Sequence, residues 1–325
     1  ERRKKMKVRK IYAVYFSATG TTEKTVCRAS QAAVRTVFSP SGDFDRNEAY
    51  KKAADTERPC PCSQKTTGGV QNGKNSFENS PAAPVKICFN SPDFRRRNLS
   101  FKRGDLVFFG VPVYAGRVPN LLLPYLREFI SGGGAAAVPI VSYGNRNFDD
   151  ALKELAQLLE RAGFFTAAGG AFVGEHAFSE ILGAGRPDAE DLDLADRLGI
   201  AAVKKVSSEN WPRQPHVPVK VPGEEPLRPY YVPRDRRGNH INILKVKPKT
   251  DRNRCTGCGL CASLCPLSSI DSGEPSLITG ICMKCGACIK KCPKRAKFID
   301  DPGYLYHRTE LEEVYARRSG SRIYI

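Results

Sequence analysis

The chain has 325 residues, of which 41% are hydrophobic and 26% are charged, an ordinary balance for a globular protein large enough for two domains. Its formal net charge of +18 is spread along the sequence without a recognisable nucleic-acid-binding motif, so we do not expect a nucleic-acid partner. No apolar run has the length of a membrane span, and the basic N-terminus leads into a strand-like segment instead of a signal-peptide core.

The first expected element is a buried β-strand over residues 9–16, followed by a polar turn and a helix that begins at Thr22. The turn contains hydroxyl donors and one glycine, namely Ser17, Thr19, Gly20, Thr21 and Thr22. A helix N-terminus binds anions because its free N–H groups and its dipole point at the turn. The absence of a lysine from this turn favours a terminal phosphate over a nucleoside triphosphate. Serine and threonine are also common N-caps, so a helix start without a ligand is the alternative.

Residues 40–84 differ in composition from their surroundings, being rich in Ser, Gly, Asn, Pro and Lys with few large apolar side chains. Such a segment cannot bury enough surface to become ordered, so we predict a disordered insertion. Cys60 and Cys62 within it are interpreted as unpaired thiols, because no histidine or second cysteine pair lies nearby. Cys27 and Cys88 are expected to be small buried hydrophobic residues of a helix and a strand.

Alternating strands and helices resume after this segment. We expect strands at 85–89, 105–110, 136–144 and 164–173, and helices at 119–130, 149–160 and 188–206. The alternation predicts an α/β fold with a doubly wound, five-stranded parallel sheet. Ligands of such sheets bind outside the carboxyl ends of the strands.

Two loops at that edge carry planar side chains and glycines. The candidate residues are Pro112, Tyr114 and Gly116 after the third strand, and Tyr143, Gly144 and Asn145 after the fourth. The tyrosine rings could stack on a planar ligand, or they could be ordinary half-buried tyrosines. Together with the phosphate-binding turn, these loops predict a site for flavin mononucleotide (FMN).

The segment S-A-T-G-T-T is similar to the phosphate-loop pattern S/T-x-T-G-x-T of the flavodoxin family, at Ser17, Thr19, Gly20 and Thr22. The resemblance covers residues 7–206, apart from the insertion. It implies a flavodoxin-like domain that binds FMN.

A proline-dense segment over residues 207–248 follows, which we predict to be a semi-rigid, extended linker. An exposed linker is the simpler interpretation, although Trp211, Tyr230 and Tyr231 suggest that it is held against a domain surface. Residues 301–325 at the other end of the chain form a mixed polar and aromatic tail with little pattern.

The predicted C-terminal domain, residues 249–300, contains two consecutive C-x2-C-x2-C-x3-C-P runs. At this spacing three cysteines ligate one 4Fe-4S cluster and the fourth ligates the neighbouring cluster. We therefore assign Cys255, Cys258, Cys261 and Cys292 to a first cluster, and Cys265, Cys282, Cys285 and Cys288 to a second. Zinc sites or disulfides are the alternatives, although zinc ribbons use two C-x2-C pairs with a longer spacer. Because the clusters need thiolates in a reducing compartment, we expect a cytoplasmic protein.

With both parts considered, the whole chain resembles fused flavodoxin and two-cluster ferredoxin proteins of anaerobic microbes. The similar segments are G-V-P-V-Y-A-G-R-V-P, Y-G-N-R-N-F-D-D-A-L and G-E-H-A-F-S. His176 in the last of these is expected to be a hydrogen-bonded structural histidine, with a general acid as the alternative. Arg117 and Arg146 could contact the flavin or be solvated loop charges.

These observations predict an electron-transfer protein that passes electrons between FMN, the two clusters and a redox partner protein. The partner could be acidic, because six cations accompany the second cysteine run: Lys284, Lys290, Lys291, Lys294, Arg295 and Lys297. An ordinary solvated face is the alternative for these six residues. A reductase of a small molecule or of NAD(P)H is the alternative, although no G-x-G-x-x-G follows a strand. Clusters that serve only as structural staples are a third possibility. The sequence does not indicate an oligomeric state.

Overall fold

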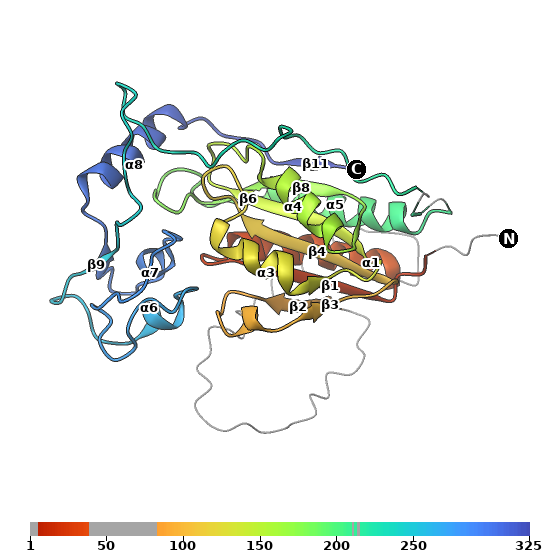
Figure 1. The fold of residues 1–325 in the computed structure, drawn as a ribbon, viewed down its shortest axis with the longest axis horizontal. Helices are drawn as coiled ribbons and strands as arrows, with labels where there is room; N and C mark the ends of the chain where they lie inside the picture. Colours follow the sequence, from red (N-terminus) through yellow and green to blue (C-terminus); the bar gives the residue numbers. More distant parts are fainter. Residues whose placement is uncertain (1–5, 39–82, 210, 213–214) are drawn as a thin grey trace.

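The computed structural model describes residues 6–38, 83–209, 211–212 and 215–325. Almost all of the predicted insertion, with Cys60 and Cys62, lies outside the described residues. The described chain forms a mixed α/β domain with a smaller cysteine-rich module beside it (Figure 1).

The central sheet has seven strands, in the order β11-β8-β6-β4-β1-β2 with β7 paired to β6. The main parallel strands are β1 (Lys10–Tyr15), β2 (Val85–Cys88), β4 (Asp105–Pro112), β6 (Ala136–Tyr143) and β8 (Gly169–Val173). Central strands β4 and β6 are buried along almost their whole length, as expected for parallel strands that are covered on both faces. The sequence therefore predicted the parallel core of the sheet.

The prediction of five strands was wrong in two places. The expected strand 164–173 is divided into β7 (Phe165–Thr166) and β8, and both pair with β6. A further strand, β11 (Arg322–Tyr324), comes from the C-terminal segment and pairs antiparallel with β8. A separate short parallel pair consists of β3 (Leu99–Ser100) and β5 (Ile130–Ser131).

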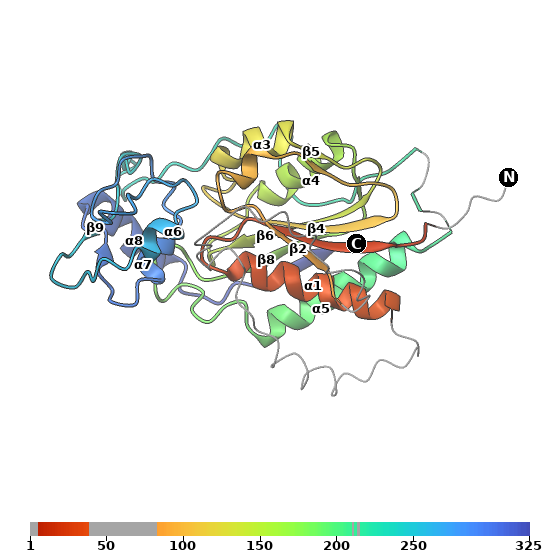
Figure 2. The same cartoon turned by 90° about the horizontal axis from the view of Figure 1, so that it is seen from below.

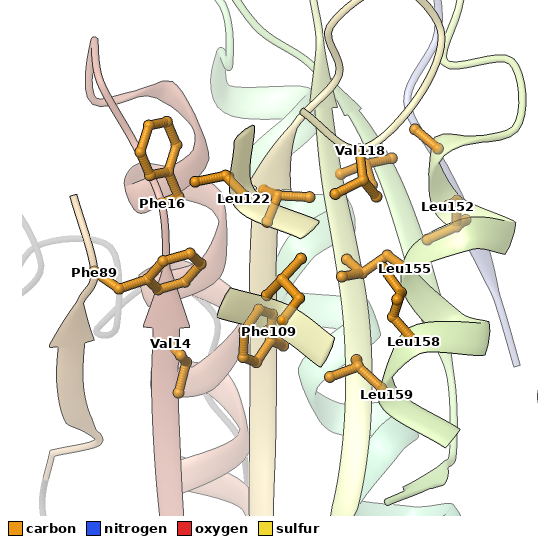
Figure 3. Packing of buried hydrophobic residues seen from close by; sticks show 14 of the residues in the cluster. Val14, Phe16, Phe89, Phe109, Val118, Leu122, Leu152, Leu155, Leu158 and Leu159 are labelled. Carbon is orange, nitrogen blue, oxygen red and sulfur yellow. The ribbon is translucent and has the colours of Figure 1, made fainter. Parts of the chain in front are cut away.

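Helices cover both faces of the sheet (Figure 2). One face is covered by α1 (Thr21–Phe38) and α5 (Ala189–Val206). The other is covered by α3 (Leu123–Glu128) and α4 (Ala151–Arg161), and 3₁₀ turns lie at Phe94–Arg96 and Asn120–Leu122. Figure 3 shows the packing on this second face, where Val14 and Phe109 of the sheet and Leu155 and Leu159 of α4 belong to one hydrophobic cluster.

Close approach of α1 to its neighbours depends on two glycines. A Cβ at Gly110 of β4 would lie 2.3 Å from Cγ2 of Val26, and one at Gly199 of α5 would lie 2.1 Å from the carbonyl oxygen of Ala29. Real Cβ contacts are not that short, so larger residues at these positions would push α1 away from the sheet and from α5. The position of α1 matters because its N-terminus supplies one wall of the cavity described below.

The cysteine-rich module contains β9 (Lys249–Thr250), α6 (Leu260–Ser263), α7 (Ala287–Lys290) and β10 (Lys297–Phe298). The two strands pair antiparallel with each other. The module lies beyond the carboxyl ends of the parallel strands, at the left of Figure 1. Ligand sites of parallel sheets lie at this edge.

The C-terminal segment returns to the α/β domain as the helix α8 (Pro302–Val314) followed by β11. Asp301 caps α8 by accepting a hydrogen bond from the backbone N–H of Tyr304 at 2.9 Å, and Pro302 occupies the first turn. This Asp-Pro pair was an available helix-start signal in a segment from which we had predicted no element. In the described part of the chain, no helix combines the length and apolar character needed to cross a membrane.

The linker is held against the α/β domain, as its aromatic residues had indicated. Trp211 is buried, and the backbone N–H of Val219 donates to Oγ1 of Thr166 at 3.1 Å. Further along, the hydroxyl of Tyr230 donates to the carbonyl oxygen of Val118 at 2.8 Å. The linker therefore has a fixed path that ends beside the cysteine-rich module.

The strongest attachment of the linker is the ion pair between Arg228 and the fully buried carboxylate of Asp150. The backbone N–H of Arg228 donates to the same carboxylate at 2.7 Å, and that of Glu224 at 3.1 Å. Hydrogen bonding to Arg228 lowers the pKa of Asp150 from 3.8 to about 2. This attachment therefore stabilises the folded protein above pH 3.8, and its contribution is lost as the pH falls towards 2.

We predict that Asp150→Asn lowers the free energy of unfolding by about 2 kcal/mol at neutral pH, since it removes a charged acceptor from three donors. Urea unfolding followed by the fluorescence of Trp211, which lies on the linker, would measure this change. The difference should be equal at pH 7 and pH 5 and shrink below pH 4. Glu225→Gln is the matched control, because Glu225 is two-thirds exposed in its pair with Lys153 and should contribute little. Equal effects of the two substitutions would contradict the assignment.

Candidate functional site

A cavity of about 450 Å³ lies at the carboxyl edge of the sheet. This volume is in the range of small-molecule and cofactor sites. Its walls come from the loops after β1, β4, β6 and β8, from the end of the linker, from α8 and from the cysteine-rich loop Ile281–Cys285. The α/β domain and the module thus share one cavity.

The hydroxyl-rich turn forms one wall, to which Ser17, Thr19, Thr21 and Thr22 contribute. Ser17 is fixed by Asn90, whose side-chain oxygen accepts from the Ser17 N–H at 2.7 Å and whose amide donates to the Ser17 carbonyl at 2.8 Å. Gly20 is not on the wall, but its φ of 104° makes the turn into α1. The turn thus places four hydroxyl-bearing residues and the start of an 18-residue helix on the wall, where Oγ of Ser17 already caps the helix by accepting from the backbone N–H of Glu23 at 3.1 Å.

The loop after β4 contributes Pro112, Tyr114 and Gly116 to the wall, as predicted from the sequence. Gly116 has a φ of 77°, and a Cβ there would lie 2.4 Å from Oδ2 of Asp149. Burial raises the pKa of Tyr114 well above its usual value, and the nearby thiol groups of Cys285 and Cys282 raise it further. Tyr114 therefore lies close to the cysteine-rich loop.

The loop after β6 differs from its predicted role. Tyr143 and Gly144 line the cavity, but the Tyr143 side chain belongs to the hydrophobic core and its hydroxyl donates to the carbonyl oxygen of Gly320 at 2.7 Å. Asn145 is not on the wall, and its amide donates to the carbonyl oxygens of Tyr315 at 2.6 Å and Arg317 at 2.8 Å. Two of the predicted cofactor residues thus anchor the C-terminal segment, whose return to the sheet was not predicted.

Several wall residues were not among our candidates. They come from the ends of β6 and β8, the linker and α8, namely Ser142, Glu175, His176, Tyr230, Tyr231, His307 and Leu311. The G-E-H-A-F-S segment was the available signal for the β8 loop. No local pattern in the linker or the C-terminal segment marks a residue as part of a cavity whose other walls come from distant parts of the chain.

Two buried polar atoms on this wall have no hydrogen-bond partner among the described residues, Oγ of Ser142 and Nδ1 of His307. Ser142 is 5% exposed and His307 is 4% exposed. A buried polar atom without a partner costs about 1–3 kcal/mol, so such atoms usually have a ligand or water as their partner. Each of the two atoms has almost no accessible surface of its own, so neither faces the open space of the cavity, although both residues contribute to its wall.

Burial lowers the pKa of His176 to about 4, with a further contribution from His307, and burial also lowers the pKa of His307 to about 4. Both imidazoles are therefore neutral at pH 7. The backbone N–H of Phe178 donates to Nδ1 of His176 at 3.1 Å, which places the His176 proton on Nε2. The expected structural hydrogen bond of His176 is present, and the side chain also borders the cavity.

The two loop arginines have different roles. The guanidinium group of Arg117 donates to both carboxylate oxygens of Glu154, at 2.7 and 2.8 Å, and it is not on the cavity wall. Arg146 does line the cavity, where it pairs with Asp149 and lies 4.7 Å above the ring of Tyr231.

The eight cysteines of the module surround two further, smaller cavities, and none of them forms a disulfide. One cavity is lined by Cys255, Cys258, Cys261 and Cys292, and the other by Cys265, Cys282, Cys285 and Cys288. This partition coincides with the assignment made from the cysteine spacing. The thiols of each group line a cavity and do not meet at one point. Among the described residues, no three His, Cys, Asp or Glu side chains are placed to hold a single metal ion.

The two halves of the module repeat the same backbone geometry. Left-handed conformations occur at matching positions, in the pairs Gly257 and Lys284, Gly259 and Gly286, and Ser268 and Arg295. After the last pair, the next backbone N–H points at a thiol, from Ser269 to Sγ of Cys265 at 3.4 Å and from Ala296 to Sγ of Cys292 at 3.3 Å. Hydrogen bonds to cluster sulfur atoms are one determinant of reduction potential.

The two cysteine groups differ in burial. Cys285 of the second group is buried and borders the large cavity, whereas Cys258 of the first group is exposed. Burial raises the pKa of Cys285 and of Cys288 to about 12. A bound metal cluster would offset this cost, because coordination deprotonates a thiol. For Cys292, burial alone would raise the pKa, but hydrogen bonds from the backbone N–H groups that follow lower it overall.

Three of the six cations expected to form a docking face are directed inward. The ammonium group of Lys297 is buried on Pro275, that of Lys290 donates to the carbonyl oxygen of Ser179 at 2.8 Å, and that of Lys284 donates to Leu244 at 2.6 Å. These lysines connect segments of the protein. Only Lys291, Lys294 and Arg295 are exposed.

Residues 247–293 match the family model of the 4Fe-4S dicluster domain. This match supports the ferredoxin part of the sequence prediction. It also supports an iron-sulfur electron-transfer role for the protein. No curated protein matches the chain.

The cysteine partition predicts that the two clusters can be removed separately. Cys255→Ser should leave a protein with about four iron atoms per chain, and Cys288→Ser should do the same, against about eight in the unaltered protein. Iron and sulfide analysis after anaerobic purification would measure this, and EPR spectra should show different remaining clusters in the two variants. Cys27→Ser, outside the module, is the control and should keep all the iron. Loss of all iron in both single variants, with the fold retained, would contradict independent sites.

Proposed function

We propose that the protein is an electron-transfer iron-sulfur flavoprotein, which passes electrons between FMN, two 4Fe-4S clusters and a redox partner protein. In this proposal residues 7–206 are a flavodoxin-like FMN-binding domain, residues 249–300 are the ferredoxin domain, and the protein works in the cytoplasm. The observation that carries the proposal is that the hydroxyl-rich turn and the ligand loop of the second cysteine group are walls of the same cavity.

The chemistry of the cavity fits FMN. The threonines at the start of α1 offer hydroxyl groups and backbone N–H groups to a phosphate. Tyr114, Tyr230 and Tyr231 on the wall provide planar side chains that could stack on the flavin ring. The main parallel strands have the order second, first, third, fourth, fifth, which is that of flavodoxin-like sheets.

FMN would supply a group that exchanges one or two electrons, whereas a 4Fe-4S cluster exchanges one at a time. The residues of the chain would hold the two kinds of centre close together. Cys282 and Cys285 border the cavity directly, and Met283 and Tyr114 lie on the same wall. A flavin in the cavity and the second cluster would therefore be neighbours, with no other segment of the chain between them.

The different burial of the two cysteine groups supports an order for the centres. The second group borders the cavity, so its cluster would be next to FMN, whereas the first group contains the exposed Cys258. Electrons would therefore pass between FMN and solvent-accessible partners through the second cluster and then the first.

Anaerobic purification followed by iron, sulfide and flavin analysis tests the proposal. We expect about eight iron atoms and one FMN per chain, and an EPR-monitored reductive titration should show two interacting reducible clusters. Zinc in place of iron, or no flavin after reconstitution with FMN, would contradict it. Rapid oxidation of NAD(P)H by the purified protein would instead favour the reductase alternative.

We further predict that Thr19→Glu weakens FMN binding at least about 100-fold, because a carboxylate at the turn repels the phosphate. Fluorescence titration of flavin-free protein would measure the two affinities. Riboflavin has no phosphate, so its affinity should change little, and Thr19→Gln is the uncharged control of similar size. An equal loss of FMN and riboflavin binding in Thr19→Glu would place the phosphate elsewhere.

A further inference from the structure

A group of exposed cations lies around the first cysteine group. We call it the outer basic face, and it consists of Arg254, Lys291, Lys294 and Arg295. Each of these residues is adjacent to a cysteine of the first group or within three positions of one, and Lys294 also borders the first cysteine cavity. Within the described part of the chain, none of the four side chains forms an ion pair or a hydrogen bond.

None of the four acidic residues that the structure describes in the module forms an ion pair with this face, and Asp251, the one nearest to Arg254 in the chain, accepts a hydrogen bond from the backbone N–H of Asn253 at 2.9 Å. Glu274 pairs with Arg252 at 3.2 Å, and Asp300 pairs with Lys249 at 2.9 Å. Asp271 accepts hydrogen bonds from the backbone N–H groups of Gly273 at 2.9 Å and Glu274 at 2.7 Å. The four cations therefore have no acidic partner among the described residues of the module, and their total charge exceeds in magnitude the charge of about −2 that an oxidised 4Fe-4S cluster with four thiolates would add.

The exposed cations of this face differ from the other lysines around the second cysteine run. Lys284, Lys290 and Lys297 belong to the same stretch of sequence, yet each is bonded to a backbone carbonyl inside the protein. The exposed cations thus adjoin Cys255 and Cys292 of the first group in the chain, and Lys294 borders the same cavity as the exposed Cys258. Charge of one sign around an exposed redox centre attracts oppositely charged partners and orients them at that centre.

We propose that the outer basic face is the docking site of an acidic, one-electron redox protein, with the first cluster as the point of electron exchange. This inference rests on the proposed function. One electron leaves the reduced first cluster and reduces the centre of the partner, or moves in the opposite direction, and no bond or proton changes hands. The second cluster exchanges electrons with the partner only through the first.

The charge of the outer basic face can be tested with small charged oxidants, so the natural partner need not be known. The reduced protein is mixed in a stopped-flow instrument with hexacyanoferrate(III), an anion, or hexaammineruthenium(III), a cation. In Lys291→Glu/Lys294→Glu the second-order rate constant for the anion should fall at least about tenfold at low ionic strength, and the ratio of the anion rate to the cation rate should fall further. The difference between the variant and the unaltered protein should shrink in 0.5 M salt.

Lys86→Glu/Lys204→Glu is the matched control, because it makes the same change in net charge at two exposed lysines of the α/β domain, one on β2 and one on α5. It should change the rates by less than about twofold. The same series is then run with a purified acidic ferredoxin as the electron acceptor, and we expect the same order of rates.

The outcomes separate the two proposals. If the unaltered protein contains no reducible clusters, the proposed function fails. If all variants have equal iron content and EPR spectra but the two charge reversals slow the anion equally, the docking inference alone is wrong. Loss of the effect with the acidic ferredoxin, while it persists with the small anion, would also overturn docking.

Discussion

The loop Ile281–Cys285 belongs to two cavities at once, and this double use constrains the rest of the structure. On one side it supplies thiols to the second cysteine group, and on the other it closes the large cavity at the sheet edge. A displacement of the loop by a few ångströms would open the large cavity to solvent. The module must therefore be held at a fixed distance from the sheet, although it is a small unit with only two short strands of its own.

Three segments provide that fixed position. The linker reaches the module after its attachment to Asp150, and it contributes Tyr230 and Tyr231 to the cavity on the way. Gly286 contacts the β8 loop so closely that a Cβ there would lie 2.6 Å from the carbonyl oxygen of Ala177. The C-terminal segment then returns to the sheet. Each attachment is made of backbone hydrogen bonds, buried ion pairs or close packing, which resist displacement better than exposed charge pairs do.

The sequence predicted those features that depend on local patterns. Apolar runs and helical spacing identified the parallel strands and the main helices, and the C-x2-C spacing identified a 4Fe-4S domain, which the family match supports. The roles of Asn145 and Tyr143 could not be predicted, because they depend on the C-terminal segment 170 or more positions away. His307 was missed for the same reason, since only the tertiary fold brings α8 to the cavity. The inward direction of Lys284, Lys290 and Lys297 likewise depends on carbonyl groups that no local pattern reveals.

The strand β11 determines the order in which the protein can be completed during synthesis. It pairs with β8 at the edge of the sheet, yet all eight module cysteines precede it in the chain. Because domains fold as their residues leave the ribosome, the sheet edge beside β8 stays open until the module has emerged. Tyr143 and Asn145 also lack their C-terminal partners until then. The final closure of the large cavity therefore follows the appearance of the cysteines, which leaves an interval in which the module is accessible before the α/β domain is locked against it.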